Sequence, residues 1–321
     1  MTQSNVCSQL KLSVILPSLN EEAAIASVIS EIRICLPQAE IYLFDNDSDD
    51  NTANIAREMG VRVFVETQRG KGNVVRRMFA DVDADIYVMI DADGTYDLSS
   101  IQQLLDLVVK ENADMVVGTR MAQYDKSDSP AGHRFGNWML TSLLNVFFNV
   151  NLKDILSGYR VFSRRFVKTA PILAKGFEIE TVLTVHALES RAVIREVPIN
   201  YRSRIEGGES KLNTIRDGIR IFSTLFFLIK NVRPLLFFSI VATILTLIGI
   251  ALGTPLIDEY FRTGLVPRFP TAILATGLMV LAAISTVAGL VLDAIAAERR
   301  SAKRLAYLSL SAPSNTFKIE S

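Results

Sequence analysis

The stretch that decides the fold is Ile86-Tyr87-Val88-Met89-Ile90-Asp91-Ala92-Asp93-Gly94. Its unbroken apolar run, ended by a glycine turn, predicts a strand buried on both faces. Two aspartates one residue apart follow the strand at its carboxyl end, which is where open α/β sheets bind ligands. Carboxylate oxygens on a short turn suit Mg²⁺ or Mn²⁺, ions that commonly hold the phosphates of a nucleotide. A solvated Asp-rich turn is the alternative interpretation of Asp91 and Asp93 taken alone.

The first two-thirds of the chain alternates between apolar runs and stretches of helical length. Strands are expected at Leu12–Leu16, Ile41–Phe44, Val61–Val65, Ile86–Ile90 and Met115–Val117. Repeating βαβ units of this size predict a mostly parallel sheet with helices on both faces. The chain has neither G-x-G-x-x-G after its first strand nor G-x-x-x-x-G-K-[ST]. A dinucleotide oxidoreductase and a P-loop enzyme are therefore disfavoured.

Composition narrows the classes of function. The 321 residues leave room for one large or two ordinary domains. Lysine and arginine number 34, and aspartate and glutamate also number 34, so the basic excess of a typical nucleic-acid binder is missing. The cysteines, Cys7 and Cys35, form no C-x-x-C pair, so neither a zinc site nor a disulfide framework is indicated. The polar N-terminus lacks the pattern of a signal peptide.

Two uncharged apolar runs lie near the C-terminus, at about 235–253 and 271–292. With a rise of about 1.5 Å per residue, a helix over either run reaches roughly 30 Å and spans a bilayer core. A pair of buried core helices is the alternative. Basic residues precede the first run and follow the second, whereas the charges of the connector Thr254–Pro270 cancel. The positive-inside rule therefore predicts a transmembrane hairpin with both chain ends in the cytoplasm.

An amphipathic helix is expected just before the hairpin. Apolar side chains recur there at helical spacing, at Ile215, Ile219, Phe222, Phe226 and Ile229. Beside a membrane span, such a helix is expected to lie in the interface plane. Packing on the soluble domain or on a neighbouring subunit is the alternative. The predicted organisation is a cytoplasmic domain at 1–211, a juxtamembrane helix at 212–233, the hairpin at 234–296 and a cytoplasmic tail at 297–321.

Eight motifs follow one another along the soluble part. They are VILPSLNEE (14–22), DNDSDDNT (45–52), RGKG (69–72), DADG (91–94), VGTR (117–120), SGYR (157–160), GFEIE (176–180) and YRSR (201–204) through SKL (210–212). In this order they resemble glycosyltransferase family 2, and within it the dolichyl-phosphate mannosyltransferase and polyprenyl-phosphate glycosyltransferase branch. The resemblance covers roughly Leu10 to Gly218. It implies the GT-A fold, a Rossmann-like α/β architecture with a mostly parallel sheet.

The resemblance assigns the donor side of the site to the first four motifs. It implies that the nucleotide sugar is bound by Pro17, Asn20, Glu21, Asp45, Lys71, Asp91, Ala92 and Asp93. Pro17, Asn20 and Glu21 would line the pocket for base and ribose, and Asp45 would accept a hydrogen bond there. Asp91 and Asp93 would hold Mg²⁺ or Mn²⁺, with Thr95 where relatives often carry glutamine. Charge compensation at a helix N-terminus is the alternative role for Glu21.

The acceptor side explains why no catalytic base is evident. A lipid phosphate monoester has its second pKa near ~6, so at neutral pH it is already an oxyanion that needs cations to position it. Arg120 and Arg134 are the candidates for this role, because arginine binds phosphate through two parallel hydrogen bonds. Arg204 and Lys211 are expected near the leaving diphosphate, and with Asp93 these cations form the expected catalytic set. Surface charge is the alternative for any single arginine.

The expected activity is inverting transfer of a hexose from a nucleotide sugar, UDP-glucose or GDP-mannose, to a membrane polyprenyl phosphate. Action on another lipid or glycan acceptor, or a non-catalytic membrane scaffold with the same fold, are alternatives. A processive synthase would carry Q-x-x-R-W, and a nucleotidyltransferase would carry a glycine-rich loop after its first strand. The expected protein is integral to the plasma membrane or another inner membrane. Its hairpin offers surfaces for a homo-oligomer, and no nucleic-acid partner is expected.

Overall fold

The computed structural model describes residues 10–120, 131–172, 174, 176, 178–202, 226 and 230–313. Arg204, Lys211 and the predicted juxtamembrane helix, apart from Phe226 and residues 230–233, lie outside the described residues. The chain forms two compact units. We call residues 1–218 with 303–321 the sheet unit and residues 219–302 the hairpin unit.

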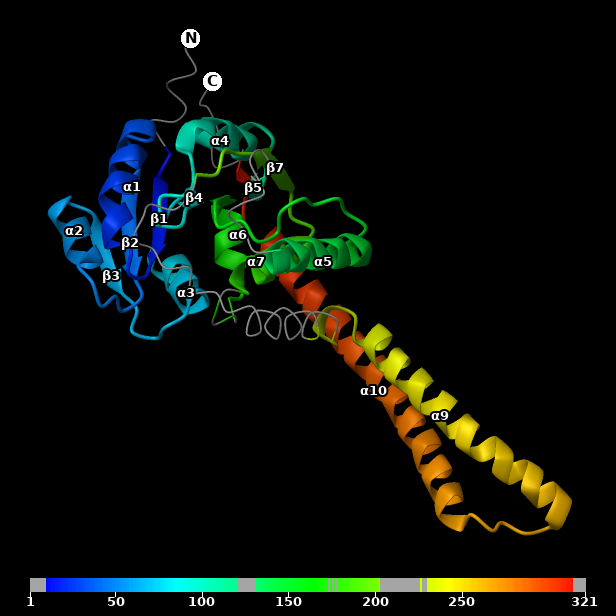
Figure 1. Ribbon diagram of the computed structural model, residues 1–321. Helices are drawn as coiled ribbons and strands as arrows, with labels where there is room; N and C mark the ends of the chain where they lie inside the picture. Colours follow the sequence, from blue (N-terminus) through cyan, green and yellow to red (C-terminus); the bar gives the residue numbers. More distant parts are fainter. Residues whose placement is uncertain are drawn as a thin grey trace. The chain divides into compact units, whose positions relative to one another are not determined.

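A seven-stranded sheet with the order β3-β2-β1-β4-β6-β5-β7 forms the centre of the sheet unit (Figure 1). Its strands are β1 (Leu12–Ser18), β2 (Glu40–Asp45), β3 (Arg62–Val65), β4 (Ile86–Met89), β5 (Met115–Thr119), β6 (Arg160–Ser163) and β7 (Ile194–Pro198). Neighbouring strands are parallel except where β6 pairs with β4 and with β5. The five expected strands are confirmed as β1 to β5, and β6 and β7 were not predicted.

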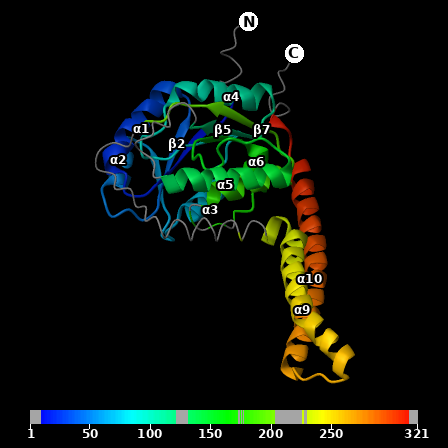
Figure 2. The same cartoon turned by 45° about the vertical axis from the view of Figure 1, so that its right-hand side comes forward.

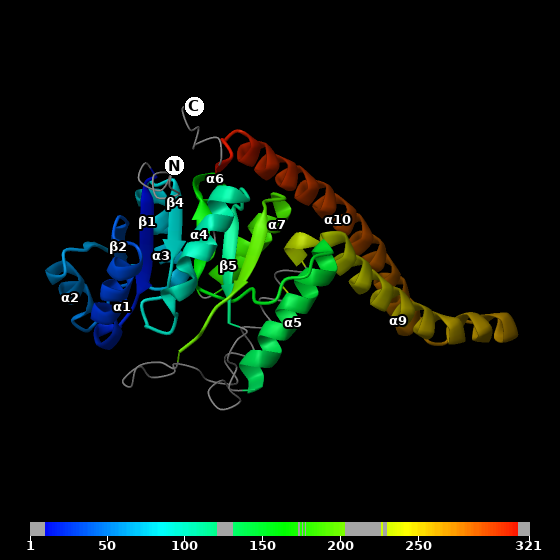
Figure 3. The same ribbon diagram turned by 90° about the horizontal axis from the view of Figure 1, so that it is seen from above.

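Helices cover both faces of this sheet (Figure 3). They are α1 (Glu22–Cys35), α2 (Thr52–Glu58), α3 (Lys71–Asp81), α4 (Ile101–Lys110), α5 (Ala131–Phe148), α6 (Arg164–Thr169) and α7 (Ile179–Glu189). Apolar side chains of α1 and α4, such as Ile29 and Leu104, form one core with alternate strand residues such as Val88. Those of α3, α6 and α7 pack with the opposite face in a second core. The predicted mostly parallel, doubly covered sheet is confirmed.

The order of the central strands fixes where a ligand is expected. The chain passes from β1 to β2 and β3 on one side, whereas β4 lies on the other side of β1. Such a reversal opens a crevice beyond the carboxyl ends of the strands on either side of it. Ser18 pairs with Asp45 at the ends of β1 and β2, and Asp91 comes just after β4. The motif residues are therefore delivered to this crevice.

The hairpin unit contains α9 (Pro234–Thr263) and the part of α10 (Phe269–Leu308) that ends at residue 302, and these helices run side by side (Figure 2). Gly249 and Gly289 permit their close packing, because a Cβ on Gly289 would lie 2.9 Å from Phe238 Cβ. Apolar side chains face outward instead of into a core, as the 61% exposure of Leu247 shows. Both helices are long and apolar enough to cross a membrane and are candidate transmembrane helices.

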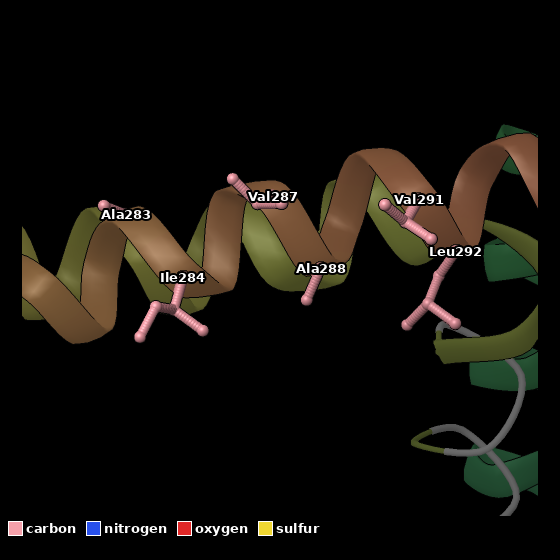
Figure 4. Close-up of a pocket in the computed structure, with 6 residues that line it drawn as sticks. All are labelled: Ala283, Ile284, Val287, Ala288, Val291 and Leu292. Carbon is pink, nitrogen blue, oxygen red and sulfur yellow. The ribbon is translucent and has the colours of Figure 1, made fainter.

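A shallow, wholly apolar hollow lies along α10 (Figure 4). It is lined by Ala283, Ile284, Val287, Ala288, Val291 and Leu292. No polar group lines it, so it suits hydrocarbon and not a charged nucleotide.

Both hairpin helices extend beyond the runs predicted to span the membrane. Residues 254–263, expected in the connector, continue α9, where Asp258 and Arg262 form an ion pair of 3.0 Å one turn apart. α10 continues to Leu308 through part of the expected tail, because charge ends a membrane span without ending a helix. Its end belongs to the sheet unit, where Tyr307 Oη donates to the fully buried Asp114 over 2.7 Å. Arg165 also donates to Asp114, over 2.8 Å.

Buried His186 in α7 makes the stability of the sheet unit depend on pH. Its ring is 3% exposed, and burial, together with the charge of Lys303, lowers its pKa to about 4. The unfolded chain takes up this proton near pH ~6.5, whereas the folded protein does not. The contribution of the neutral His186 ring to the free energy of unfolding is thus fully present above pH ~6.5 and is lost as pH falls toward 4. At about 1.4 kcal/mol per unit, the loss approaches ~3 kcal/mol.

We therefore expect the unfolding temperature in detergent to fall between pH 7.5 and pH 5. Replacing His186 with asparagine should make that fall clearly shallower, because the group that takes up the proton is gone. Equal pH dependence in the two proteins would show that His186 does not resist protonation in the fold.

Candidate active site

Asp91 and Asp93 follow β4 on a tight turn at the carboxyl edge of the sheet. Gly94 closes the turn with a φ of 71°, a conformation that favours glycine. Asp93 is 7% exposed, and its Oδ1 accepts from the Thr95 amide over 3.2 Å and from the Thr95 hydroxyl over 2.6 Å. Thr95 therefore holds the Asp93 carboxylate in place without adding charge, in the position where glutamine was the expected residue.

Lys71 lies between two carboxylates of the site. Its Nζ is 2.6 Å from Asp91 Oδ1 and 2.6 Å from Glu180 Oε1 of α7. Burial alone would lower the pKa of Lys71, but Asp91 and Glu180 together raise that pKa above its ordinary value. The ammonium therefore stays charged. The resemblance implied that Lys71 binds the nucleotide sugar, but this bridge was not predicted.

Asn46 builds the loop that presents Lys71. Gly70, the residue before α3, has a φ of 129° and donates its amide to Asn46 Oδ1 over 2.7 Å. The Asn46 side-chain amide donates to the carbonyls of Glu66 and Gln68 over 3.0 and 2.9 Å. Asn46 is buried directly after β2. Sequence reasoning missed this residue, although it lies inside the D-N-D-S motif.

Gly158 touches the same carboxylate from another direction. A Cβ at this position would lie 2.2 Å from Asp91 Oδ2. Its amide donates to the buried Tyr96 hydroxyl over 2.9 Å, which fixes the loop before β6 against the turn. The close approach, and not a left-handed backbone, is what requires glycine here. The S-G-Y-R motif carried this signal, but its glycine was given no role.

The remaining expected donor-binding residues meet where β1 and β2 end. Pro17 pairs with Phe44, and Asp45 is 3% exposed and accepts from the Ser48 amide over 3.1 Å. Asn20 has a φ of 55°, and its side-chain oxygen accepts from the Asp49 amide over 2.9 Å. The two strand-end loops are thus tied together at the edge that would receive a base and ribose.

Glu21 and its neighbours also serve the starts of two helices. Glu21 precedes α1, and its amide donates to Thr52 Oγ1 over 2.9 Å. Asp50 accepts from the amides of Glu22 and Thr52 over 3.1 and 3.0 Å. Asp50 therefore satisfies amides at the first turns of both α1 and α2, which is a capping role.

Arg120 directly follows β5 and is held by a buried carboxylate. Its Nε and Nη2 donate to the two oxygens of Asp154 over 2.8 and 2.9 Å. Burial would raise the pKa of Asp154, but the hydrogen bonds and charge of Arg120 outweigh it and lower that pKa. The guanidinium also lies 5.8 Å from the centre of the Tyr201 ring. A phosphate-binding role for Arg120 stays a prediction, and the structure adds that its orientation is already set.

Arg134 and Arg160 are placed differently from Arg120. Arg134 belongs to α5. Arg160 is fully buried and donates to the carbonyls of Ile155 and Ser157, so its guanidinium holds the loop that carries Gly158. The roles of Arg204 and Lys211 stay predictions on residues outside the described part.

The oxygen donors fit a hard divalent cation. Among the described residues, no group of three or more His, Cys, Asp and Glu side chains could hold a metal alone. Asp91 and Asp93 offer two carboxylates on one turn, and Thr95 fixes the second. Ions such as Mg²⁺ are typically bound by one or two carboxylates, with substrate phosphates and water completing the shell. The turn therefore fits an ion that arrives with a diphosphate.

Comparison with known proteins decides the family. Residues 13–170 match glycosyl transferase family 2. Glycosyltransferase AglJ of Haloferax volcanii is 32% identical over 241 residues, which cover 75% of this chain and 79% of AglJ. The chain belongs to glycosyltransferase family 2. A dolichyl-phosphate hexose transferase of Haloferax volcanii is 31% identical to this family member over 211 residues, or 65% of this chain and 90% of the relative.

A solved structure shows the same fold in another member of this architecture. Glucosyl-3-phosphoglycerate synthase from Mycobacterium tuberculosis, in complex with Mn²⁺, UDP-glucose and phosphoglyceric acid, matches with a TM-score of 0.57 and 23% identity. The match covers 70% of this chain and 80% of that chain. The expected GT-A fold of this glycosyltransferase is confirmed.

Proposed function

We propose that this glycosyltransferase transfers a hexose from UDP-glucose or GDP-mannose to a polyprenyl phosphate, with inversion at the anomeric carbon. The observation that carries the proposal is the D-x-D turn at the sheet edge, with Lys71 against it, in a chain that also has two helices of membrane-spanning length. Similarity to a dolichyl-phosphate hexose transferase over 90% of that protein's length supports the acceptor class.

On the donor side, Asp91 and Asp93 would hold Mg²⁺ or Mn²⁺ against the diphosphate, with Thr95 orienting Asp93. Such an ion offsets the charge that develops on a departing nucleoside diphosphate. Lys71 supplies a second positive charge at the same place. Asp45, Asn20 and the loops they hold together would bind the base and ribose.

On the acceptor side, the phosphate oxyanion attacks the anomeric carbon without a protein base, because it carries no proton to be removed at neutral pH. Arg120 would hold this oxyanion with a guanidinium that Asp154 already orients. Arg134 is proposed to assist on the acceptor, and Arg204 and Lys211 on the leaving diphosphate. The long lipid would reach the site from the bilayer that holds α9 and α10.

The test is a screen of labelled nucleotide sugars with polyprenyl phosphate and Mn²⁺ in detergent. We expect one hexose donor to place label in the lipid extract, and EDTA to abolish that transfer. Transfer to a soluble glycan that is unaffected by leaving out the lipid phosphate would refute the acceptor assignment. Absence of transfer from every donor would favour the scaffold alternative.

Arg120→Ala should raise the KM for polyprenyl phosphate or lower kcat, with little change in nucleotide affinity. One lost charged hydrogen bond is worth about 1.5–3 kcal/mol, or roughly ten- to a hundredfold. Lysine should rescue only in part, because it lacks the planar fork. Initial rates at varied lipid phosphate, with calorimetry of donor binding, measure both effects.

A control is needed because Arg120→Ala leaves Asp154 buried without its main partner. The double variant Arg120→Ala/Asp154→Asn removes that uncompensated charge and should keep the same lipid defect with a more stable fold. Loss of donor binding with unchanged dependence on lipid would reassign Arg120 to the donor side.

We also propose that both chain ends and the sheet unit lie in the cytoplasm. Basic residues flank the hairpin on the side of the chain ends, as the positive-inside rule requires. A cysteine at Thr263, the last residue of α9, should react with an impermeant maleimide added outside intact cells, whereas one at Ser314 should react only after permeabilisation. The reverse pattern would invert the topology.

A further inference from the structure

The bridge made by Lys71 contains one carboxylate of the metal turn and one that lies outside it. Asp91 belongs to the turn after β4, whereas Glu180 belongs to the first turn of α7. The Lys71 ammonium is 2.6 Å from an oxygen of each. The Lys71 and Glu180 side chains are only 12% and 6% exposed, so water does little to screen this contact.

This contact conflicts with a divalent ion bound to Asp91. Such an ion bonds carboxylate oxygen at about 2.0–2.2 Å, and Lys71 already occupies Asp91 Oδ1. An ion bound there would lie close to the Lys71 ammonium, and two positive charges so close together repel strongly in a partly buried site. The other oxygen, Oδ2, faces Gly158, where even a Cβ would lie 2.2 Å away. An ion bound to Asp91 would therefore compete with the Lys71 ammonium for the negative charge of this carboxylate.

We propose that Lys71 is an exchangeable internal cation. It bridges Asp91 and Glu180 in the ligand-free enzyme, and it gives up Asp91, keeps Glu180 and turns toward the donor diphosphate when the divalent ion binds Asp91. Glu180 is then a positioning residue that acts through Lys71. The proposal rests on the proposed function in one respect, because the diphosphate of a nucleotide sugar is the anion that would receive part of the ammonium's charge.

Side-chain contacts hold the first turn of α7, where Glu180 lies. Arg160, the first residue of β6, donates to Thr184 Oγ1 over 3.1 Å. Thr184 Oγ1 in turn donates to the Glu180 carbonyl over 2.9 Å. The backbone of Glu180 is therefore held in the first turn of α7, and the proposed exchange assigns the change of partner to the longer Lys71 side chain.

The two neutralising substitutions should act in opposite directions on Mn²⁺ binding without nucleotide. Lys71→Met removes the competitor and should tighten Mn²⁺ binding roughly ten- to a hundredfold, the value of one charge-assisted contact. Glu180→Gln removes the receiving group and should weaken Mn²⁺ binding. In the Lys71→Met background, Glu180→Gln should have little further effect, because Glu180 acts through Lys71. Lys71→Arg keeps the charge and should stay close to wild type.

The experiment is a titration of the full-length protein in detergent with Mn²⁺ alone, followed by electron paramagnetic resonance, and repeated with UDP and with GDP. Lys168→Met is the matched control, since Lys168 contacts the Val82 carbonyl and Asp83 and not the site. Wild-type Mn²⁺ affinity in Lys71→Met would overturn the proposal. The proposal would also be overturned if Glu180→Gln weakened Mn²⁺ binding equally in the wild-type and Lys71→Met backgrounds. Glu180 would then act on the ion independently of Lys71.

These titrations need neither sugar nor lipid, so they separate the exchange from the proposed activity. If Mn²⁺ affinity rose in Lys71→Met and fell in Glu180→Gln but no hexosyl transfer was detected, the exchange would be supported and the donor or acceptor assignment refuted. Flat titrations with normal transfer would refute the exchange alone.

Discussion

Asp93→Ala is expected to abolish hexosyl transfer, lowering kcat/KM at least about a thousandfold, while the sheet unit stays folded. A bound divalent ion contributes several kcal/mol to the departure of a diphosphate, and each ~1.4 kcal/mol is a factor of ten in rate. Asp93 is the buried carboxylate that Thr95 holds toward this task. Its loss leaves the Thr95 hydroxyl without that acceptor, which costs only about 1–3 kcal/mol of stability.

Asp91→Ala should be less severe, because Asp93 stays in place and Glu180 still pairs with Lys71. Initial rates at saturating Mn²⁺, together with unfolding temperatures, measure both variants. Asp106→Ala is the control, since Asp106 is an exposed carboxylate on α4 that pairs only on the surface with Lys110. Near-normal turnover by Asp93→Ala, with Mn²⁺ still required, would refute the assignment of the metal turn.

Gly158→Ala should lower kcat/KM about a hundredfold with a modest loss of stability. The new methyl group would lie 2.2 Å from Asp91 Oδ2, far inside van der Waals contact, so the carboxylate or the loop must shift. A displacement of about 1 Å at a reacting centre can cost roughly a hundredfold in rate. Overpacking of this kind typically costs about 1–3 kcal/mol of stability.

Gly277→Ala is the matched control, because nothing beyond the adjacent residues and backbone of its own helix lies within 4 Å of the corresponding Cβ position. Both glycine variants are compared with wild type by kcat/KM for Mn²⁺-dependent hexosyl transfer and by unfolding temperature. If Gly158→Ala retained wild-type kcat/KM, the close approach to Asp91 would have no role in placing the carboxylate.

The sheet was predictable where its strands are continuous apolar runs. β1 to β5 have such runs, but β6 is only Arg160–Ser163 and contains a fully buried arginine, which no hydrophobic pattern signals. β7 has two adjacent charged residues, Arg195 and Glu196, in place of an apolar run, and it ends in Pro198, as suits a strand at the edge of the sheet. The continuation of α10 was hidden because Arg299 and Arg300 mark the end of a membrane span and not the end of a helix.

The site was predictable as a set of residue types and not as a set of contacts. Strand-end motifs indicated that Asp91, Lys71 and Arg120 would gather at one edge. The partners of these residues come from distant segments, Glu180 from α7 and Asp154 from the loop before β6. Only the folded sheet brings such segments together, so no local spacing in the sequence encodes the pairings.

The mass of the lipid product tests the central claim most directly. Polyprenyl phosphate, Mn²⁺ and the accepted nucleotide sugar should yield a lipid heavier by one hexosyl residue that still carries a single phosphate, with an equal amount of nucleoside diphosphate released. A lipid that gained a second phosphate, with nucleoside monophosphate released, would contradict the account, because sugar phosphate and not sugar would have been transferred.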